Sequence, residues 1–256
     1  VGINTLKGKL AHKVLEEMLR QLGAYQNKAT LTAWVDQTLQ QLMEKEGSPL
    51  PLYGKEPEKL NFINKVQYAA WHLYSLIQEN NWQPLAIEEE LETTWQDIRL
   101  RARADLVLQR GHDERLVMDF KWKSKTYRKE MMLNKEDLQL CLYAWMYKAN
   151  LKWPATAWFV VEPSLVITRN SNAFKDIQAL PNTETESVLY PGIMQQIEKT
   201  WNWRMEQLEQ GRIELRTEAN ASLLEEHYED DLSDLLEMKT QDAPFDDYQV
   251  LVGKFQ

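Results

Sequence analysis

The apolar residues of the first eighty positions recur with the period of an α-helix. The clearest run, spaced four residues apart, comprises Leu6, Leu10, Val14, Met18 and Leu22. This spacing places one apolar stripe on an otherwise polar helix. Further helices are predicted over about 30–45 and 59–79, and the Gly- and Pro-containing segment 47–51 between them is typical of a linker.

After Pro84 the period shortens to that of β-strands. Residues 85–95, 98–109 and 116–123 alternate between apolar and polar side chains, and turn-forming residues separate them. Three such runs in succession predict an antiparallel meander. Glutamates of the first run and arginines of the second are expected to pair across it: Glu88, Glu90, Glu92, Arg99, Arg101 and Arg103.

The helical period returns over about 135–150, and the segments 156–161 and 165–169 are predicted to be two short strands. A last helix is predicted over 191–210. This order of elements predicts an α+β or mixed α/β fold, with a central mixed β-sheet flanked by helices.

One domain is expected over residues 1–216, with a helical N-terminal part of about 1–83 and a sheet core of about 84–170. Residues 217–256 are acidic and are expected to pack on this domain or cover it. Within them, residues 218–247 carry eleven acids and one lysine, whereas the whole chain has a net charge of −9. The rest of the chain is therefore near neutral, and the net charge does not exclude a nucleic-acid partner. We interpret the acidic segment as a solvated amphipathic helix, and a DNA mimic covering a basic surface is the alternative.

Composition excludes several classes of protein. Ten tryptophans and ten tyrosines indicate a packed fold rather than a disordered chain. No window holds the roughly 18 uninterrupted apolar residues of a membrane-spanning helix, and the first residues do not resemble a signal peptide. We therefore expect a cytoplasmic protein without a membrane partner. The single Cys141 cannot form an internal disulfide or hold an iron–sulfur cluster.

The segment 117–123 holds the first candidate chemistry. Residues two apart on a strand share a face, so Asp119 and Lys121 point the same way, while Phe120 and Trp122 point towards a core. A carboxylate and an ammonium between apolar neighbours are costly unless something uses them. A simple ion pair on a half-exposed strand is the alternative interpretation.

Asp105 favours a functional site over a simple ion pair. If the hairpin turn is centred on His112, Asp105 lies directly opposite Asp119, with Cβ atoms about 4.5–5.5 Å apart. Facing carboxylates repel each other unless a cation lies between them, and oxygen ligands suit Mg²⁺ or Mn²⁺. A slip of one residue in the register would place Asp105 on the opposite face.

In order and approximate spacing, these residues resemble the PD-(D/E)XK nuclease superfamily, and within it the RecB-like (RecB/AddB-type) exonuclease branch. The branch motifs Gly-x-x-x-His, a strand-ending Asp, Asp-Tyr/Phe-Lys and Gln-x-x-x-Tyr are matched by Gly8 and His12, Asp105, Asp119-Phe120-Lys121, and Gln139 and Tyr143. The resemblance implies a restriction-endonuclease-like core. Two departures, Ala102 in place of a common Gly and Trp122 in place of Thr or Ser, remove no metal ligand.

The resemblance also implies a Mg²⁺- or Mn²⁺-dependent deoxyribonuclease. The implied metal ligands are His12, Asp105, Asp119 and the backbone carbonyl of Phe120. The implied catalytic residues are Asp105, Asp119, Lys121 and Gln139. The ion would polarise the scissile phosphate and activate a water, which Lys121 would orient while stabilising the developing negative charge. Gln139 and Tyr143, one helical turn apart, would flank the site or contact DNA.

The neighbouring residues suit a phosphate backbone. Between positions 121 and 135 a single acid, Glu130, opposes six basic residues: Lys121, Lys123, Lys125, Arg128, Lys129 and Lys135. The candidate contacts to nucleic acid are Lys123, Lys125, Arg128, Lys129, Tyr143 and Trp122, the last by stacking on bases. A solvated lysine-rich loop is the alternative interpretation.

We therefore expect a DNA exonuclease that acts in repair or recombination. The chain does not begin with methionine and its first motif lies at residue 8, which is compatible with an excised C-terminal domain of a helicase–nuclease. Its helicase domain or subunit would then be a missing partner, while a free-standing exonuclease, including the CRISPR-associated kind, stays open. The alternatives are a catalytically inactive nuclease-fold module that binds DNA or scaffolds a repair complex, and an acidic helical interaction protein.

Overall fold

The computed structural model describes residues 2–46, 50, 52, 54–148, 152–181, 184–212 and 234–236 of the 256-residue chain. It divides into two compact units, residues 1–190 and 191–256. The sheet and the candidate site belong to the first unit. In the second, Lys199 forms an ion pair of 2.5 Å with Asp234. The remainder of the acidic segment lies outside the described residues, and so do both interpretations of it, the amphipathic helix and the DNA mimic.

The elements of the described chain, in order, are α1 (Ile3–Arg20), the 3-10 helix η1 (Leu22–Ala24), α2 (Lys28–Lys45), α3 (Glu56–Glu79), β1 (Gln83–Trp95), β2 (Ile98–Arg110), β3 (Glu114–Lys121), α4 (Lys125–Leu133), α5 (Leu138–Met146), β4 (Ala155–Val160), β5 (Leu165–Thr168) and α6 (Glu186–Glu209). The helices and strands predicted between residues 1 and 210 are present within a few residues of their expected bounds. None of the described helices combines the length and apolar character needed to cross a membrane.

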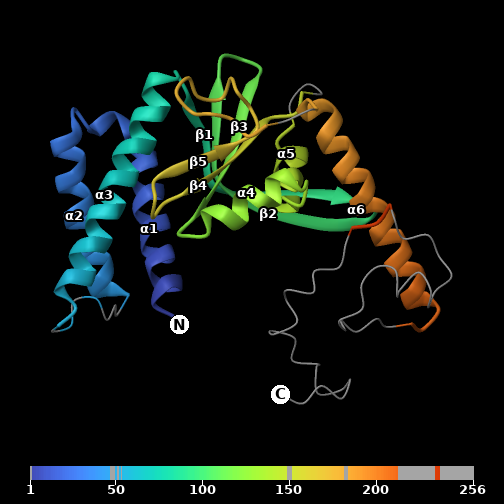
Figure 1. The fold of residues 1–256 in the computed structure, drawn as a ribbon, viewed down its shortest axis with the longest axis horizontal. Coiled ribbons are helices and arrows are strands. Elements are labelled where there is room, and N and C mark those ends of the chain that lie inside the picture. The colour runs from blue at the N-terminus through green and yellow to red at the C-terminus, as the bar shows by residue number, and fades with distance from the viewer. Residues whose placement is uncertain are drawn as a thin grey trace. The chain divides into compact units, whose positions relative to one another are not determined.

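The N-terminal helices form where the apolar stripe and the capping residues predict them. In α1, the stripe residues Leu10, Val14 and Met18 are buried. A capping box starts α2, because the side chain of Asn27 accepts a hydrogen bond from the Thr30 backbone N–H while the Thr30 hydroxyl accepts one from the Asn27 N–H. Figure 1 shows α2 and α3 side by side, with α1 next to them on the side of the sheet.

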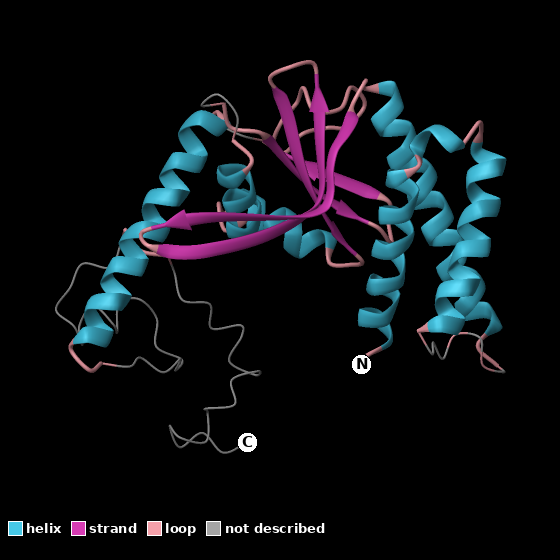
Figure 2. Cartoon of the chain, turned by 180° about the vertical axis from the view of Figure 1, so that it is seen from behind, coloured by secondary structure: helices cyan, strands magenta, loops and turns pink. Residues whose placement is uncertain are grey.

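The sheet has five strands in the order β1–β2–β3–β4–β5. The first three strands form the predicted antiparallel meander, β3 and β4 run parallel, and β4 and β5 are antiparallel. The parallel pair requires a crossover, which contains α4 and α5. The central mixed sheet with flanking helices is therefore confirmed (Figure 2).

Alternate residues of the central strands pack against different helices. Leu106 and Met118 belong to a large core cluster with α1, α2 and α3. Val117 lies in a second cluster with residues of α5, and Trp158 in a third with residues of α4 and α5. Asp119, two residues after Val117, consequently points to the side of α5, whereas Phe120 packs in the large core with α1.

Helix α4 is the element that the sequence did not predict, since its residues read as a lysine-rich loop. Met132 is its only buried residue, and the basic residues around it give the segment the composition of a solvated loop. The helix forms between β3 and α5, and Ser124 before it and Lys135 after it adopt left-handed backbone conformations, with φ of 76° and 60°.

A buried ion pair holds the crossover against β5. The carboxylate of Asp137, at the start of α5, accepts hydrogen bonds from both terminal nitrogens of Arg169, at 2.7 and 2.5 Å. Arg169 also donates from Nε to the Met132 carbonyl at 3.1 Å, at the end of α4. Asp137 is 0% exposed and Arg169 8%, so each charge relies on the other for its compensation.

Replacing Asp137 by Ala is expected to lower the free energy of unfolding by about 3–5 kcal/mol, because Arg169 would remain as an uncompensated buried charge. Urea denaturation of the two proteins measures the difference. Asp113→Ala is the control, since its carboxylate is exposed and 3.5 Å from Lys152, and it should change stability little. Equally small effects of both substitutions would contradict the role given to the buried pair.

Candidate active site

The two predicted aspartates meet at the end of the β2–β3 ladder. The register expected for a turn centred on His112 is confirmed, since Leu106 pairs with Met118 and Val107 with Val117. Asp105 and Asp119 occupy the next opposing positions and are only 9% and 2% exposed. The backbone ladder ends there, and the Phe120 N–H donates a hydrogen bond to the Asp105 carboxylate.

Burial makes both carboxylates hard to ionise. The pKa of Asp105 rises to about 8, mainly because burial disfavours its charge and also because the Asp119 carboxylate repels it. The pKa of Asp119 is raised by burial too, although the nearby Lys121 ammonium counteracts this rise. A cation between the two carboxylates would offset both effects.

Lys121 contacts Asp119 directly. Its ammonium lies 2.6 Å from Asp119 Oδ2 and 5.3 Å from the centre of the Trp158 ring. Trp158 pairs with Asp119 in the parallel β3–β4 ladder, so β4 supplies an aromatic ring for a cation–π interaction with the ammonium. The Asp-x-Lys segment is therefore more than a surface ion pair.

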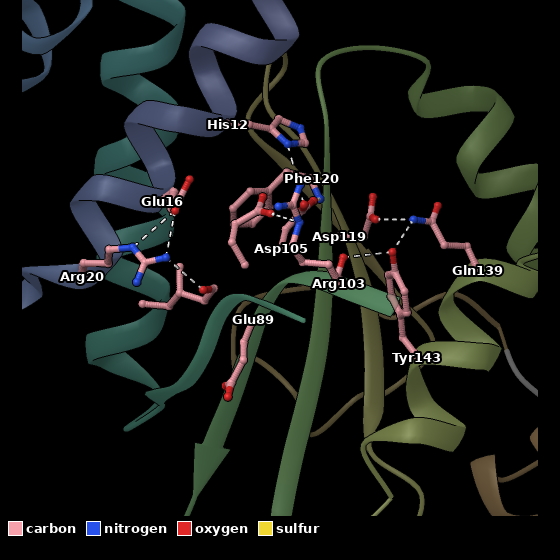
Figure 3. Close-up of polar contacts among 12 residues, drawn as sticks. His12, Glu16, Arg20, Glu89, Arg103, Asp105, Asp119, Phe120, Gln139 and Tyr143 are labelled. Carbon is pink, nitrogen blue, oxygen red and sulfur yellow. Dashed lines mark hydrogen bonds and ion pairs between the residues drawn. The ribbon is translucent and has the colours of Figure 1, made fainter. Parts of the chain in front are cut away.

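Helix α1 brings His12 to the same place from the other side of the sheet (Figure 3). Its Nδ1 lies 3.7 Å from Asp105 Oδ1, and its ring meets the Phe120 ring edge-on at 5.8 Å. Burial, with the positive charge of Lys121, lowers the pKa of His12 to about 4, and a hydrogen bond to the Phe120 backbone acts in the opposite direction. The imidazole is therefore neutral near pH 7, as a metal ligand must be.

Helix α5 supplies the two residues of the predicted Gln-x-x-x-Tyr motif. Gln139 donates to Asp119 Oδ1 at 2.7 Å and to the Tyr143 hydroxyl at 2.9 Å. The Tyr143 hydroxyl donates in turn to the Arg103 carbonyl of β2 at 3.1 Å. Figure 3 shows this chain of contacts running from Asp119 across α5 and back to β2. Gln139 and Tyr143 thus orient Asp119 and connect the two strands.

Glu88 is a member of the site that the sequence analysis did not select. Among the described residues, His12, Glu88 and Asp105 form the group whose possible ligand atoms all lie within 4.8 Å of one another. Glu88 forms an ion pair of 3.0 Å with Arg103, which is the kind of pairing expected across these strands. The pattern of charges in the sequence indicates this pairing but not a place in the site. The oxygens of Asp119 instead contact Gln139 and Lys121.

This set of donors fits a hard divalent cation. It offers carboxylate oxygens, which Mg²⁺ and Mn²⁺ prefer, and one neutral imidazole. A cation would also neutralise the repulsion between the facing carboxylates. A cavity of about 640 Å³ lies on the same side, and its lining includes His12, Glu88, Lys9, Lys13 and Arg103.

The predicted nucleic-acid contacts separate into different environments. Lys125 and Lys129 are exposed on α4, and Lys123 lies 3.5 Å from Glu162. The half-buried guanidinium of Arg128 lies 4.9 Å from the centre of the Trp158 ring and 5.1 Å from that of Tyr127. Its position beside Trp158 places it on the Lys121 side of the site.

Trp122 lies in the core rather than at a surface that DNA could reach. It is 8% exposed, and its ring meets Phe62 edge-on at 5.3 Å. This placement agrees with the side assigned to it by strand alternation and corrects its expected role as a base-stacking residue. Tyr143 likewise has its hydroxyl engaged by Gln139 and Arg103.

Asp105, Asp119, Lys121 and His12 thus lie together at the strand ends of a mixed sheet, which is the arrangement that the resemblance to metal-dependent nucleases implies. The family model of the PD-(D/E)XK nuclease superfamily matches residues 3–249, and the chain belongs to this superfamily. A comparison with curated proteins finds no significant match.

The raised pKa of Asp105 predicts a pH dependence of stability in EDTA. Between pH 6.5 and the folded-state pKa of about 8, the folded protein must release a proton that an unfolded carboxyl, with a pKa of about 3.9, has already lost. Stability should therefore fall as pH rises through this window. His12, with its pKa lowered to about 4, gives the opposite slope, but only below about pH 6.5.

Thermal unfolding across pH 6.5–8 tests this sign, since the melting temperature of Asp105→Asn should vary less than that of the wild type. Asp119 contributes in the same direction, so the slope should be reduced rather than abolished. The control Asp113→Asn, in an exposed turn residue, should keep the wild-type slope. An identical slope in Asp105→Asn would exclude the protonated carboxyl.

Proposed function

We propose that this protein is a RecB-like DNA exonuclease that hydrolyses phosphodiester bonds with Mg²⁺ or Mn²⁺. One observation carries the proposal. Asp105 and Asp119 occupy opposing, buried positions of β2 and β3. The Lys121 ammonium lies 2.6 Å from Asp119, and His12 Nδ1 lies 3.7 Å from Asp105. Membership of the PD-(D/E)XK superfamily supports the nuclease chemistry.

The residues of the site have distinct tasks in this proposal. A bound divalent cation would supply Lewis acidity to the scissile phosphate. Asp119 holds the Lys121 ammonium, which is thereby positioned to orient the attacking water and to stabilise the negative charge that develops on the phosphate. Gln139 fixes Asp119 through its 2.7 Å hydrogen bond, so α5 limits the movement of both charged groups.

The DNA backbone is proposed to lie over α4. Lys125 and Lys129 present exposed charges there, suited to phosphate contacts that do not depend on base sequence. Arg128 is held against two aromatic rings, which leaves a planar guanidinium able to donate two hydrogen bonds to one phosphate. In this arrangement α4 guides the strand towards Lys121.

The biological setting follows from the family resemblance alone. RecB-like nucleases act in DNA repair or recombination, and a helicase domain or subunit is the partner that the resemblance implies. The competing proposal is a catalytically inactive nuclease-fold module that binds DNA or scaffolds a repair complex. The complete set of His12, Asp105, Asp119 and Lys121 favours the active enzyme, and metal-dependent cleavage separates the two.

Asp119→Asn and Lys121→Met should each lower the rate of DNA cleavage by about 10²–10³-fold or more, because each removes a charge next to the reacting phosphate. Release of labelled nucleotides from linear single- and double-stranded DNA, with Mg²⁺, Mn²⁺ or EDTA, measures this loss. Asp113→Asn and Lys152→Met, which alter an exposed pair of 3.5 Å, are matched controls and should cleave at the wild-type rate.

Closed circular DNA distinguishes exonuclease from endonuclease action in the same assay. Degradation of linear DNA with circular DNA left intact is expected. Cleavage of both would retain the nuclease and reject the exonuclease. No metal-dependent cleavage by the wild-type protein would favour the inactive binding module.

The double variant Lys125→Gln/Lys129→Gln should weaken DNA binding more at low salt than at high salt. Losing two phosphate contacts should reduce the slope of log K against log salt by about 1.4 for single-stranded and about 1.8 for double-stranded DNA. Fluorescence anisotropy in EDTA measures binding without cleavage. The control double variant Lys28→Gln/Lys45→Gln changes two exposed lysines of α2 and should leave the slope unchanged. Equal slopes for the two double variants would show that α4 does not contact DNA.

A further inference from the structure

Glu88 is placed as a metal ligand would be, although no sequence motif selects it. Its carboxylate has an oxygen within 4.8 Å of the candidate ligand atoms of both His12 and Asp105. The three residues come from α1, β1 and β2, so only the tertiary fold brings them together. Two carboxylates and one imidazole from separate elements form a set that divalent cations bind.

The backbone of β1 has a local irregularity at Glu88, although the strand continues on both sides. In the β1–β2 ladder, Ile87 pairs with Leu106 and Glu89 pairs with Ala104. Glu88, between them, has a φ of 50°, which residues other than glycine rarely adopt. The opposing residue on β2 is Asp105, whose carboxylate accepts the Phe120 N–H. Both strands therefore depart from regular pairing at the two carboxylates.

The neighbouring glutamates of β1 have no such placement. In Figure 3 the side chain of Glu89 points away from His12 and Asp105. Glu92 pairs with Arg99 and Arg101 on the outer part of the hairpin, where its side chain is 38% exposed. The Glu88 side chain is only 16% exposed, and it lines the cavity that His12 also lines.

The one ion pair of Glu88 in the described residues does not account for this position. Its partner Arg103 is 64% exposed and lies 3.0 Å away. Exposed arginines form weak pairs that contribute little to stability, and such a pair does not require a backbone turned into the left-handed region. The carboxylate can exchange Arg103 for a cation without leaving the site.

We propose that Glu88 is a further carboxylate ligand of the divalent cation, on the His12 side of Asp105. The proposal rests on the proposed metal-dependent function, because it assigns one more ligand to the same site. It also gives the cation a path, since the cavity of about 640 Å³ reaches both Glu88 and His12. The strand irregularity in β1 then serves to turn one glutamate inwards.

Binding of Mn²⁺ to the DNA-free protein tests the assignment without relying on activity. Isothermal titration calorimetry should show Glu88→Gln binding Mn²⁺ about 10-fold or more weakly than the wild type, as expected for a lost interaction at a metal centre. Glu92→Gln is the matched control, since it removes a glutamate of the same strand that pairs with arginines, and it should bind like the wild type. Arg103→Gln should not weaken binding, because it leaves the Glu88 carboxylate in place.

A second variant, Glu88→Gly, tests the assignment in a protein that is expected to keep its fold. Glycine adopts the φ of 50° found at this position without steric cost, so its melting temperature in EDTA should be close to that of the wild type. Its melting temperature should nevertheless rise less than the wild-type value when Mn²⁺ is added. A folded Glu88→Gly protein with the full Mn²⁺-induced rise would overturn the proposal.

The outcomes separate this proposal from the proposed nuclease function. If Glu88→Gln binds Mn²⁺ with wild-type affinity while Asp105→Asn no longer binds it, Glu88 is not a metal ligand. The proposed nuclease function would be unaffected by that result. If Arg103→Gln loses as much Mn²⁺ affinity as Glu88→Gln, the ion pair between the two residues matters and Glu88 is not a metal ligand. Binding that depends on Glu88 in a protein that cleaves no DNA would retain the ligand and reject the nuclease.

Discussion

Asp105 and Asp119 repel each other at the buried end of the β2–β3 ladder, and each neighbouring element supplies a group that offsets this repulsion. β3 contributes the Lys121 ammonium and the Phe120 N–H, and α5 contributes the Gln139 amide. These groups stabilise the charges only in part, since the pKa of Asp105 is still raised to about 8. The remaining cost comes mainly from burying the charge and also from the repulsion between the two carboxylates. A divalent cation would remove it, so the features that destabilise the ionised metal-free site favour metal binding.

The fold places this pair where both helical layers can reach it. Leu106, Met118 and Phe120 pack in the core that includes α1, and this packing carries His12 to the strand ends. Val117 packs with residues of α5 on the other side, which carries Gln139 to Asp119. The buried pair of Asp137 and Arg169 holds the start of α5 against β5. Packing and ion pairs outside the candidate site thus determine its geometry.

Different parts of the site were predictable to different degrees. The register that opposes Asp105 to Asp119 followed from the turn alone, because a hairpin constrains the pairing on both sides of it. The pairing of β1 glutamates with β2 arginines followed from strand alternation in the same way. The sequence predicts both a core position and a stacking contact with DNA for Trp122. Only its packing against Phe62 decides for the core position.

The sequence by itself determined the helices with an apolar period, the meander, and the residues of the four ordered motifs, because each depends on spacing along the chain. Only the tertiary structure decided that α4 is a helix and that Glu88 turns towards His12. Helix α4 is short and strongly basic and buries one residue, so its composition favours a solvated loop. Glu88 resembles its neighbours Glu89 and Glu90 in sequence, and its left-handed backbone lies where β1 meets His12 of α1 and Asp105 of β2, which are distant along the chain.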